Sequence, residues 1–330
     1  MILHAAVLLL SLQEFLAGSG KAPAAYILSK TADHRVVIVG ENHWQRADAV
    51  LVGSLVPVLK QQNVALAMEF FHAANQSDVD ALIAAEQWNE PLANSILRAA
   101  DWPYVQYRDV LKAAWRAKLT VIALGPPDDW RKQGIDYDKF MAERVLAYAK
   151  DDQHRVLAYC GMHHAFTRFL QVERRRDGRA TEFMDRFGNI LWRRLAEDVF
   201  LIALHKPDPC GDGDNVYGKL CAPLDGAIDC AAQQSGGKPV AFDVLGSPVA
   251  EAKFPAASFY ARNHPLLRLI DYADGYVWSG PVDAIAMVDV IPLAEYDPAS
   301  ANDPKKQAEW ARDAERLAHP KRRAAISCPP

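Results

Sequence analysis

The amino-acid sequence predicts an α/β fold with a mainly parallel sheet flanked by helices. Five short apolar runs, rich in Val, Ile and Leu, show little alternation, which is typical of strands covered on both faces. Segments with helical periodicity separate these runs, and this alternation favours right-handed crossovers between parallel strands. The chain has 330 residues, half of them hydrophobic, which is enough to bury a sizeable core.

Each predicted element can be placed on the sequence. The strands are RVVIVG (35–40), VALAMEF (64–70), LTVIAL (119–124), RVLAYC (155–160) and VFLIAL (199–204). Helices are expected at 46–61, 105–117, 136–150 and 181–197, because apolar residues recur there on one stripe. Pro57 predicts a kink in the first of these helices.

The composition changes after the fifth strand. Residues 206–256 are rich in Gly, Pro and Asp, so we interpret them as a lid-like insertion before the last strand. Strand-like composition returns at 275–293, which is expected to close the sheet. We therefore divide the chain into an N-terminal segment (1–30), an α/β domain (31–297) and a polar C-terminal helix with a basic tail (298–330).

The N-terminal segment fits two interpretations. AAVLLLSL (5–12) has the length of a signal-peptide core, but no Lys or Arg precedes it, and Glu14 follows closely. We favour an amphipathic helix that packs on the domain. A cytoplasmic and a secreted or periplasmic location both remain open. No apolar run has the length of a transmembrane helix.

Charge and cysteine content exclude some classes of protein. The formal net charge is −4 and no basic stripe occurs, so nucleic acid is not an expected partner. Five cysteines, an odd number, do not indicate a disulfide framework in a chain of this length, and Cys160 is expected in the core. No role is assigned to Cys210, Cys221 and Cys230, because they lack the C-x-x-C spacing of zinc sites.

Ionisable residues follow three of the predicted strands. The first strand ends in Gly40-Glu41-Asn42-His43, the second in Glu69 with His72 close behind, and the fourth in Gly161-Met162-His163-His164. Ligands of an open parallel sheet bind outside the carboxyl ends of its strands, so we expect these groups to converge.

Imidazole and carboxylate groups together indicate two kinds of chemistry. They ligate a divalent cation such as zinc, manganese or iron, or they act without metal as general base and acid. The primary candidates are Glu41, His43, Glu69 and His164. His163 and His72 are secondary candidates, which either orient such a group or lie on a helix surface. Gly40 and Gly161 fit a chain that turns sharply beside a ligand. A helix cap or a structural histidine explains one such position, but not four at matching strand ends.

These motifs resemble the ChaN-like families of the haem-binding-uptake and Tiki superfamily, which also includes TraB-type proteins and is related in fold to erythromycin esterases. The resemblance consists of VVIVGENH with its Gly-Glu-x-His turn, ALAMEFF with its strand ending in Glu, and GMHHA with a second Gly-x-x-His. YRDVLKAAWRAKLTVIALGPP (107–127) looks like the helix–strand pair of these families. By motif order, the resemblance covers residues 33–205 and 275–293.

The resemblance implies two different functions. Tiki-type members are regarded as metal-dependent hydrolases, which implies His43, Glu69 and His164 as metal ligands or catalytic groups, with Glu41 beside them. ChaN is regarded as a haem-binding lipoprotein, but this sequence has no lipidation Cys near its start. Erythromycin esterases imply ester hydrolysis without a metal.

We therefore expect hydrolysis of an ester or amide in a small-molecule or peptide substrate. The alternative is a protein that binds haem or iron without turnover. For haem, Tyr104 and Tyr107 offer a known type of ligand, although aromatic packing also explains them. The sequence indicates neither the metal nor the oligomeric state.

Overall fold

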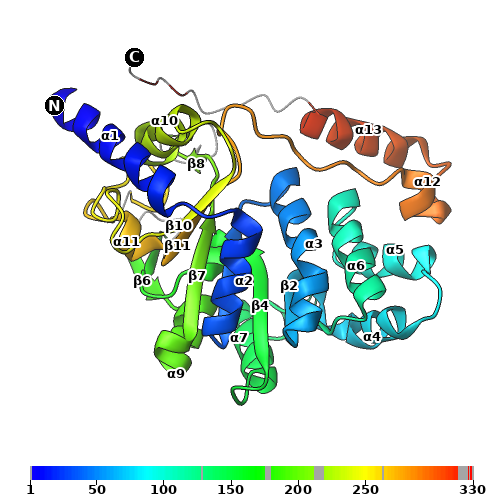
Figure 1. Ribbon diagram of the computed structural model, residues 1–330. Helices are drawn as coiled ribbons and strands as arrows, with labels where there is room; N and C mark the ends of the chain where they lie inside the picture. Colours follow the sequence, from blue (N-terminus) through cyan, green and yellow to red (C-terminus); the bar gives the residue numbers. More distant parts are fainter. Residues whose placement is uncertain are drawn as a thin grey trace.

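A seven-stranded sheet forms the centre of the protein (Figure 1). The computed structural model describes residues 2–127, 129–174, 180–211, 219–261, 264–318, 326 and 328. The strand order is β10-β11-β7-β1-β4-β2-β3, and every neighbouring pair is parallel except β10 with β11. These strands are β1 (Val36–Glu41), β2 (Val64–His72), β3 (Val121–Gly125), β4 (Arg155–Gly161), β7 (Val199–Leu204), β10 (Val240–Asp243) and β11 (Gly275–Trp278).

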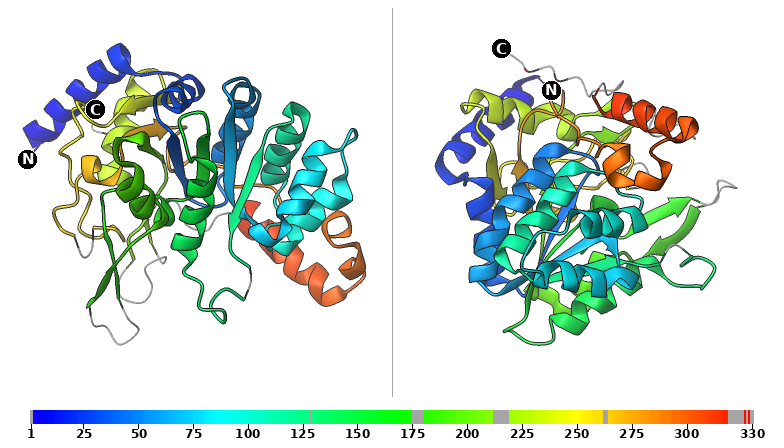
Figure 2. Two further views of the ribbon diagram at one scale, coloured as in Figure 1. Left: turned by 90° about the horizontal axis from the view of Figure 1, so that it is seen from below. Right: turned by 90° about the vertical axis from the view of Figure 1, so that its right-hand side faces the viewer.

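Helices cover both faces of the sheet (Figure 2). One face packs against α1 (Ile2–Ser19), α7 (Tyr137–Tyr148), α8 (Met162–Ala165), α9 (Phe187–Leu195), α10 (Ala227–Gln234) and α11 (Leu269–Tyr272). The other packs against α2 (Pro23–Asp33), α3 (Arg46–Gln61), α4 (Gln76–Ala84), α5 (Glu90–Ala99), α6 (Val105–Ala117), α12 (Leu293–Tyr296) and α13 (Pro304–Ala318). Alternate residues of each strand enter opposite cores, as Ile38 and Val39 do in β1. The predicted fold class is therefore confirmed.

Two elements differ from the sequence prediction. In the segment expected as one helix at 181–197, strand β6 (Ala180–Met184) comes first and pairs with β5 (Gln171–Arg174), and α9 follows. In the segment expected as a strand at 275–293, only β11 joins the sheet. β11 does not close the sheet either, because β10 lies outside it at the edge. The prediction followed apolar composition, but in residues 279–292 the apolar side chains of Val288 and Ile291 are buried in the core on one face of the sheet without forming a strand.

The segment expected as a lid-like insertion, residues 206–256, contributes to the main fold. It supplies α10 to one face and β10 to the edge of the sheet. It also holds a small ladder of β8 (Asp208–Pro209) and β9 (Leu220–Cys221).

The expectation that the cysteines form no disulfides is wrong. Cys210 is bonded to Cys221 and Cys230 to Cys328, across sequence separations of 11 and 98 residues. The odd total reflects Cys160, which is free and buried in the core as predicted. Cys328 lies far from the other cysteines in sequence, so spacing alone did not indicate its partner.

The N-terminal helix packs against the domain. Leu12 and Leu16 of α1 are buried in the core, and Phe15 contacts Phe242 of β10 with ring centroids 5.9 Å apart. Among the described helices, none is both long enough and apolar enough to cross a membrane.

Candidate active site

The carboxyl ends of β1, β4 and β2 bring the predicted ionisable residues together. These strands are neighbours in the order β1-β4-β2, and Glu41 lies level with Gly161 in the register of β1 and β4. Met68 of β2 lies level with Tyr159 of β4, so Glu69 follows at the same edge. Residues separated by 120 positions in sequence therefore meet because parallel strands end on one side of the sheet.

His43 is held by the carboxylate of Glu41. Nδ1 of His43 lies 2.8 Å from Oε1 of Glu41, so it donates to the carboxylate and leaves Nε2 for chemistry. The hydroxyls of Tyr107 and Tyr159 also donate to Glu41, which is 1 % exposed. Burial lowers the pKa of His43, but the hydrogen bond to Glu41 and the charge of Glu69 outweigh it, so the pKa is raised.

Glu69 lies between the two Gly-x-x-His turns. Its Oε2 accepts a hydrogen bond from the backbone N–H of Gly161 at 2.7 Å, and its Oε1 lies 3.4 Å from Nε2 of His164. A Cβ atom at Gly161 would lie 2.9 Å from Nε2 of His43 and 3.5 Å from Oε2 of Glu69. Both side chains thus lie close to the backbone of Gly161, which is possible because residue 161 has no side chain.

His164 has an arrangement similar to that of His43. Its Nδ1 lies 2.7 Å from Oδ1 of Asp138 in α7, and Arg186 donates to the other oxygen at 3.2 Å. Burial lowers the pKa of His164, but the charges of Glu69 and Asp138 outweigh it, so this pKa is raised. Burial raises the pKa of Asp138, but the hydrogen bond from His164, with Arg186 and the N–H of Phe187, leaves it lowered.

The arrangement suits proton transfer at two points. Two imidazoles each have Nδ1 fixed by a carboxylate, and both rings lie beside Glu69. A carboxylate that fixes one ring nitrogen orients the other as a base or an acid. The side chains of His43 and His164 are 32 % and 18 % exposed, so both are reachable from solvent.

The remaining predicted residues lie around this group, and the ring centroid of His163 is 5.7 Å from that of His164. His163 points toward Arg186, whose Nη2 lies 2.6 Å from Nε2 of the imidazole. His72, at the end of β2, lies beside Gly125. Tyr107 is fully buried against Glu41, and Tyr104 is 8 % exposed. A side chain at Gly40 would meet Met162, so this glycine serves packing.

The predicted metal set does not have the geometry of a metal centre. Across the described parts of the chain, no group of three or more His, Cys, Asp or Glu side chains is arranged to hold an ion. Glu69 uses Oε2 to accept from Gly161, and each candidate imidazole has Nδ1 engaged by a carboxylate. The positions of His43, Glu69 and His164 therefore give no support to the predicted metal site.

Several residues of the site were missed in the sequence. Asp138 lies in α7, and Arg186 is the residue just before α9. Their side chains reach His164 because α7 packs against α9. Tyr159 lies inside a strand and had the pattern of a core residue. The only signal was its polar hydroxyl in an otherwise apolar run, because a buried hydroxyl needs a partner.

Asp48 is a second buried carboxyl group near Glu41. It lies in the first turn of α3, is 1 % exposed, and neither carboxyl oxygen has a hydrogen-bond partner among the described residues. Burial raises its pKa well above the ordinary value, the charge of Glu41 adds to this, and Lys206 opposes it. Lys206 follows β7, the other neighbour of β1, and is 4 % exposed.

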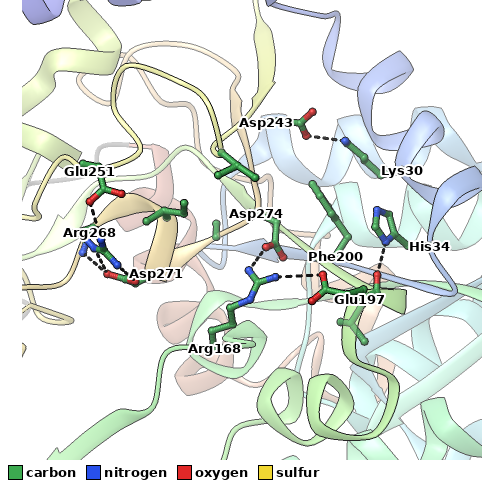
Figure 3. A pocket seen from close by; sticks show the side chains of 14 residues that line it. Lys30, His34, Arg168, Glu197, Phe200, Asp243, Glu251, Arg268, Asp271 and Asp274 are labelled. Atoms are coloured by element: carbon green, nitrogen blue, oxygen red, sulfur yellow. Dashed lines mark hydrogen bonds and ion pairs between the residues drawn. The ribbon is translucent and has the colours of Figure 1, made fainter.

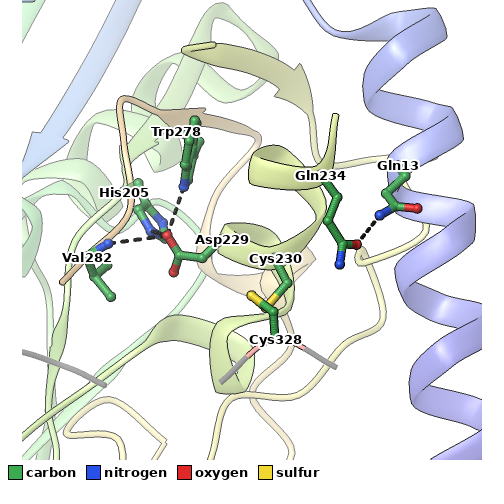
Figure 4. Close-up of a disulfide and its surroundings, with 8 residues drawn as sticks. All are labelled: Gln13, His205, Asp229, Cys230, Gln234, Trp278, Val282 and Cys328. Carbon is green, nitrogen blue, oxygen red and sulfur yellow. Dashed lines mark hydrogen bonds and ion pairs between the residues drawn. A yellow bond between two sulfur atoms is a disulfide. The ribbon is translucent and has the colours of Figure 1, made fainter. Parts of the chain in front are cut away.

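A separate buried histidine, His205, has a structural role. Its Nδ1 lies 2.7 Å from the hydroxyl of Tyr276. Its Nε2 lies 2.8 Å from Oδ1 of Asp229, as Figure 4 shows. Both ring nitrogens are occupied and the side chain is inaccessible, so substrate cannot reach it. The pair fixes α10 to the sheet, next to the disulfide of Cys230.

A hollow of about 730 Å³ lies at the opposite, amino end of the strands (Figure 3). Its charged side chains pair with one another, as Lys30 does with Asp243 at 2.7 Å and Arg168 with Asp274. None of the predicted site residues lines it. We place the candidate site at the carboxyl edge, because there two imidazoles fixed at Nδ1 by carboxylates lie near Glu69.

Comparisons with known proteins agree with the predicted resemblance. A family model described as haem-binding uptake, Tiki superfamily, ChaN matches residues 27–136. No curated protein matches the chain. The crystal structure of a succinoglycan biosynthesis protein is similar to that of this chain, with a TM-score of 0.59 and 10 % sequence identity. The match covers 83 % of this chain and 96 % of the other.

Two further structures can be compared in the same way. A Bacillus cereus protein has a TM-score of 0.53, 10 % identity, and coverage of 82 % of this chain and 97 % of the other. An erythromycin esterase variant in its open conformation has a TM-score of 0.44 and 10 % identity, over 77 % of this chain and 92 % of the other. At these identities, the first two structures support the fold alone.

Proposed function

We propose that this chain, whose residues 27–136 match the family model described as haem-binding uptake, Tiki superfamily, ChaN, hydrolyses an ester or amide bond. The observation that carries the proposal is the pair of carboxylate-anchored imidazoles, His43 and His164, on either side of Glu69. This arrangement supplies a base and an acid at one place, which hydrolysis requires.

In the proposed mechanism, His43 activates water. Its Nε2 takes a proton from a water molecule as the oxygen attacks the carbonyl carbon, while Glu41 stabilises the imidazolium through Nδ1. Glu41 itself cannot contact substrate, because it is buried and its oxygens accept from His43, Tyr107 and Tyr159. It therefore orients His43 and does not act as the base.

His164 completes the reaction. The bond between the carbonyl carbon and the leaving oxygen or nitrogen breaks, and the leaving atom takes a proton from Nε2 of His164. Asp138 holds the other nitrogen of that ring, and Glu69 favours the protonated forms of both histidines.

The test is turnover of a panel of model esters and amides by the full chain. We expect His43→Ala and His164→Ala each to lower kcat by about 10²- to 10⁴-fold. His154→Ala is the matched control, since its Nδ1 also lies beside a carboxylate, that of Asp151. Dialysis against a chelator should leave turnover unchanged, because the proposed mechanism uses only side chains of the protein. No turnover of any substrate in the panel would contradict the proposal.

The description of the matching family favours a second candidate, the binding of haem or iron without turnover. Tyr107 is a poor haem ligand, because its hydroxyl is fully buried against Glu41. His43, the more exposed imidazole of the site, would be the ligand. Haem titration of the native chain should then give a Soret band that His43→Ala loses.

We also infer that the chain matures outside the cytoplasm, in an oxidising compartment. The support is the two disulfides, since such bonds persist where thiols are not kept reduced. Fractionation of cells that express the full chain tests this inference. Recovery of the protein with reduced cysteines from the cytoplasm would contradict it.

A further inference from the structure

Three aromatic side chains border His43, and we call Trp44, Phe70 and Trp102 the aromatic wall. Their ring centroids lie 6.1, 5.5 and 5.3 Å from that of the imidazole, at interplanar angles of 66–85°. Phe70 and Trp102 are nearly parallel to each other, with centroids 4.9 Å apart. The wall therefore stands beside the ring that carries the proposed base, and Trp44 and Trp102 remain partly exposed.

The backbone holds the wall in a defined position. The N–H of Val288 donates to the carbonyl oxygen of Trp44 at 2.8 Å, and the N–H of Ile291 donates to that of Pro103 at 2.8 Å. One segment of chain thereby ties the loop after β1 to the loop before α6. Trp44 has a φ of 75°, an unfavourable value for a bulky residue, so these contacts fix a costly conformation.

The two tryptophans of the wall are partly exposed beside His43. Their indole N–H groups are buried and have no acceptor among the described residues, as is also the case for Trp88 and Trp192 outside the wall. The guanidinium of Arg316 lies over the ring of Trp44, 5.5 Å from its centroid. The wall presents uncharged rings beside a site whose other members are all ionisable. It therefore suits the uncharged, planar part of a ligand whose polar part lies at His43 and Glu69.

We propose that the aromatic wall is a subsite for an aryl group of the substrate, next to the bond that His43 hydrolyses. The statement about hydrolysis rests on the proposed function, whereas the statement about aryl binding does not. Aromatic rings stack with centroids 4.5–7 Å apart, so a bound aryl ring on the wall lies within reach of His43.

Chemical protection of His43 tests the subsite in the unmutated full chain. Diethyl pyrocarbonate modifies accessible imidazoles, and mass spectrometry measures the rate at each histidine with and without 1-naphthol. We expect 1-naphthol to slow the modification of His43 and not that of His154. The two side chains are 32 % and 37 % exposed, and each has Nδ1 beside a carboxylate, so they are matched.

Variants of Trp102 locate the bound ring. In Trp102→Leu, the 1-naphthol concentration that protects half of His43 should rise about tenfold, and Trp102→Phe should stay close to the native value. Trp88→Leu is the control, because Trp88 is also a partly buried indole of the same core and contacts Trp115 rather than His43.

Either of two results would overturn the subsite. One is unchanged modification of His43 in the native chain at saturating 1-naphthol. The other is equal protection in Trp102→Leu and in the native chain. Protection without turnover of any ester would leave the aryl subsite standing and remove only the proposed hydrolysis. If Trp102→Leu fails to fold, the comparison of His43 with His154 in the native chain still decides the question.

Discussion

At the scale of single residues, the protonation of two histidines governs the proposed activity. The hydrogen bond from His43 to Glu41 and the charge of Glu69 outweigh burial and raise the pKa of His43 above 6.5, and Glu69 and Asp138 do the same for His164. A base works above its pKa and an acid below it. The rate maximum should therefore lie on the alkaline side of pH 6.5.

The variant Glu41→Gln tests whether Glu41 raises the pKa of His43. The amide keeps the shape of the carboxylate but removes its charge, so the pKa of His43 should fall and the rising limb of the pH–rate profile should move to lower pH. The stability supplied by the raised pKa of His43 is fully present below pH 6.5 and is lost as pH rises through the raised value. Imidazole proton shifts in NMR measure the pKa directly. An unchanged pKa of His43 would refute the role given to Glu41.

The size of residue 161 is a second determinant of activity at this scale. In Gly161→Ala, the new Cβ would lie 2.7 Å from Cε1 of His43, so the imidazole must move. We expect kcat to fall by about tenfold or more, since misplacement of a catalytic group by about 1 Å costs up to about 10²-fold.

The control for Gly161→Ala is Gly53→Ala in α3. Its Cβ would lie 3.5 Å from Val110, an ordinary contact, and alanine in a helix stabilises by about 0.5–1 kcal/mol. Steady-state kinetics and urea unfolding of both variants provide the comparison. Full activity of Gly161→Ala would show that His43 does not need its observed position.

At the scale of elements, Asp138 couples α7 to α9 and to the site. Its Oδ1 accepts from the N–H of Phe187 and from His164, and its Oδ2 accepts from Arg186, which is 4 % exposed. Asp138→Asn removes the charged acceptor that His164, Arg186 and the N–H of Phe187 share, and we expect a loss of about 3 kcal/mol in the free energy of unfolding at pH 7. Urea unfolding measures this loss.

The pH dependence and a neighbouring residue give controls for Asp138. The lowered pKa of Asp138 means that its contribution to the free energy of unfolding is present above pH 3.8 and is lost as pH falls through the lowered value.

The control variant Asp136→Asn should change stability little, because Asp136 caps α7 by accepting from the N–H of Lys139, which asparagine also does. Equal losses in the two variants would contradict the coupling.

The positions of the elements show which parts of the fold and of the candidate site could be predicted from the sequence. The central strands were predicted to within a few residues, because strands buried on both faces need unbroken apolar runs. The approach of His43, Glu69 and His164 followed from parallel strands that end on one side. Asp138 and Arg186 could not be predicted, because their place at His164 depends on how α7 and α9 pack. Spacing also could not indicate that Cys230 pairs with Cys328.

At the scale of the whole molecule, the two disulfides differ in how much chain they constrain. Cys230–Cys328 spans 98 residues and Cys210–Cys221 spans 11. By the chain-entropy model, the long link stabilises by about 4–5 kcal/mol and the short one by about 3 kcal/mol. The variant Cys230→Ser with Cys328→Ser should therefore lose more stability in urea unfolding than Cys210→Ser with Cys221→Ser. The opposite order would contradict this account.

The buried thiol of Cys160 can be used to measure how often the folded protein opens. Cys160 is the only cysteine outside a disulfide, it lies on β4 between β1 and β2, and burial raises the pKa of its thiol well above the ordinary value. Its side chain lies in the core on the face that α7, α8 and α9 cover, so an alkylating reagent can react there only when that core opens. The alkylation rate under native conditions, followed as one mass increment, would thus give the frequency of that opening without denaturant or mutation.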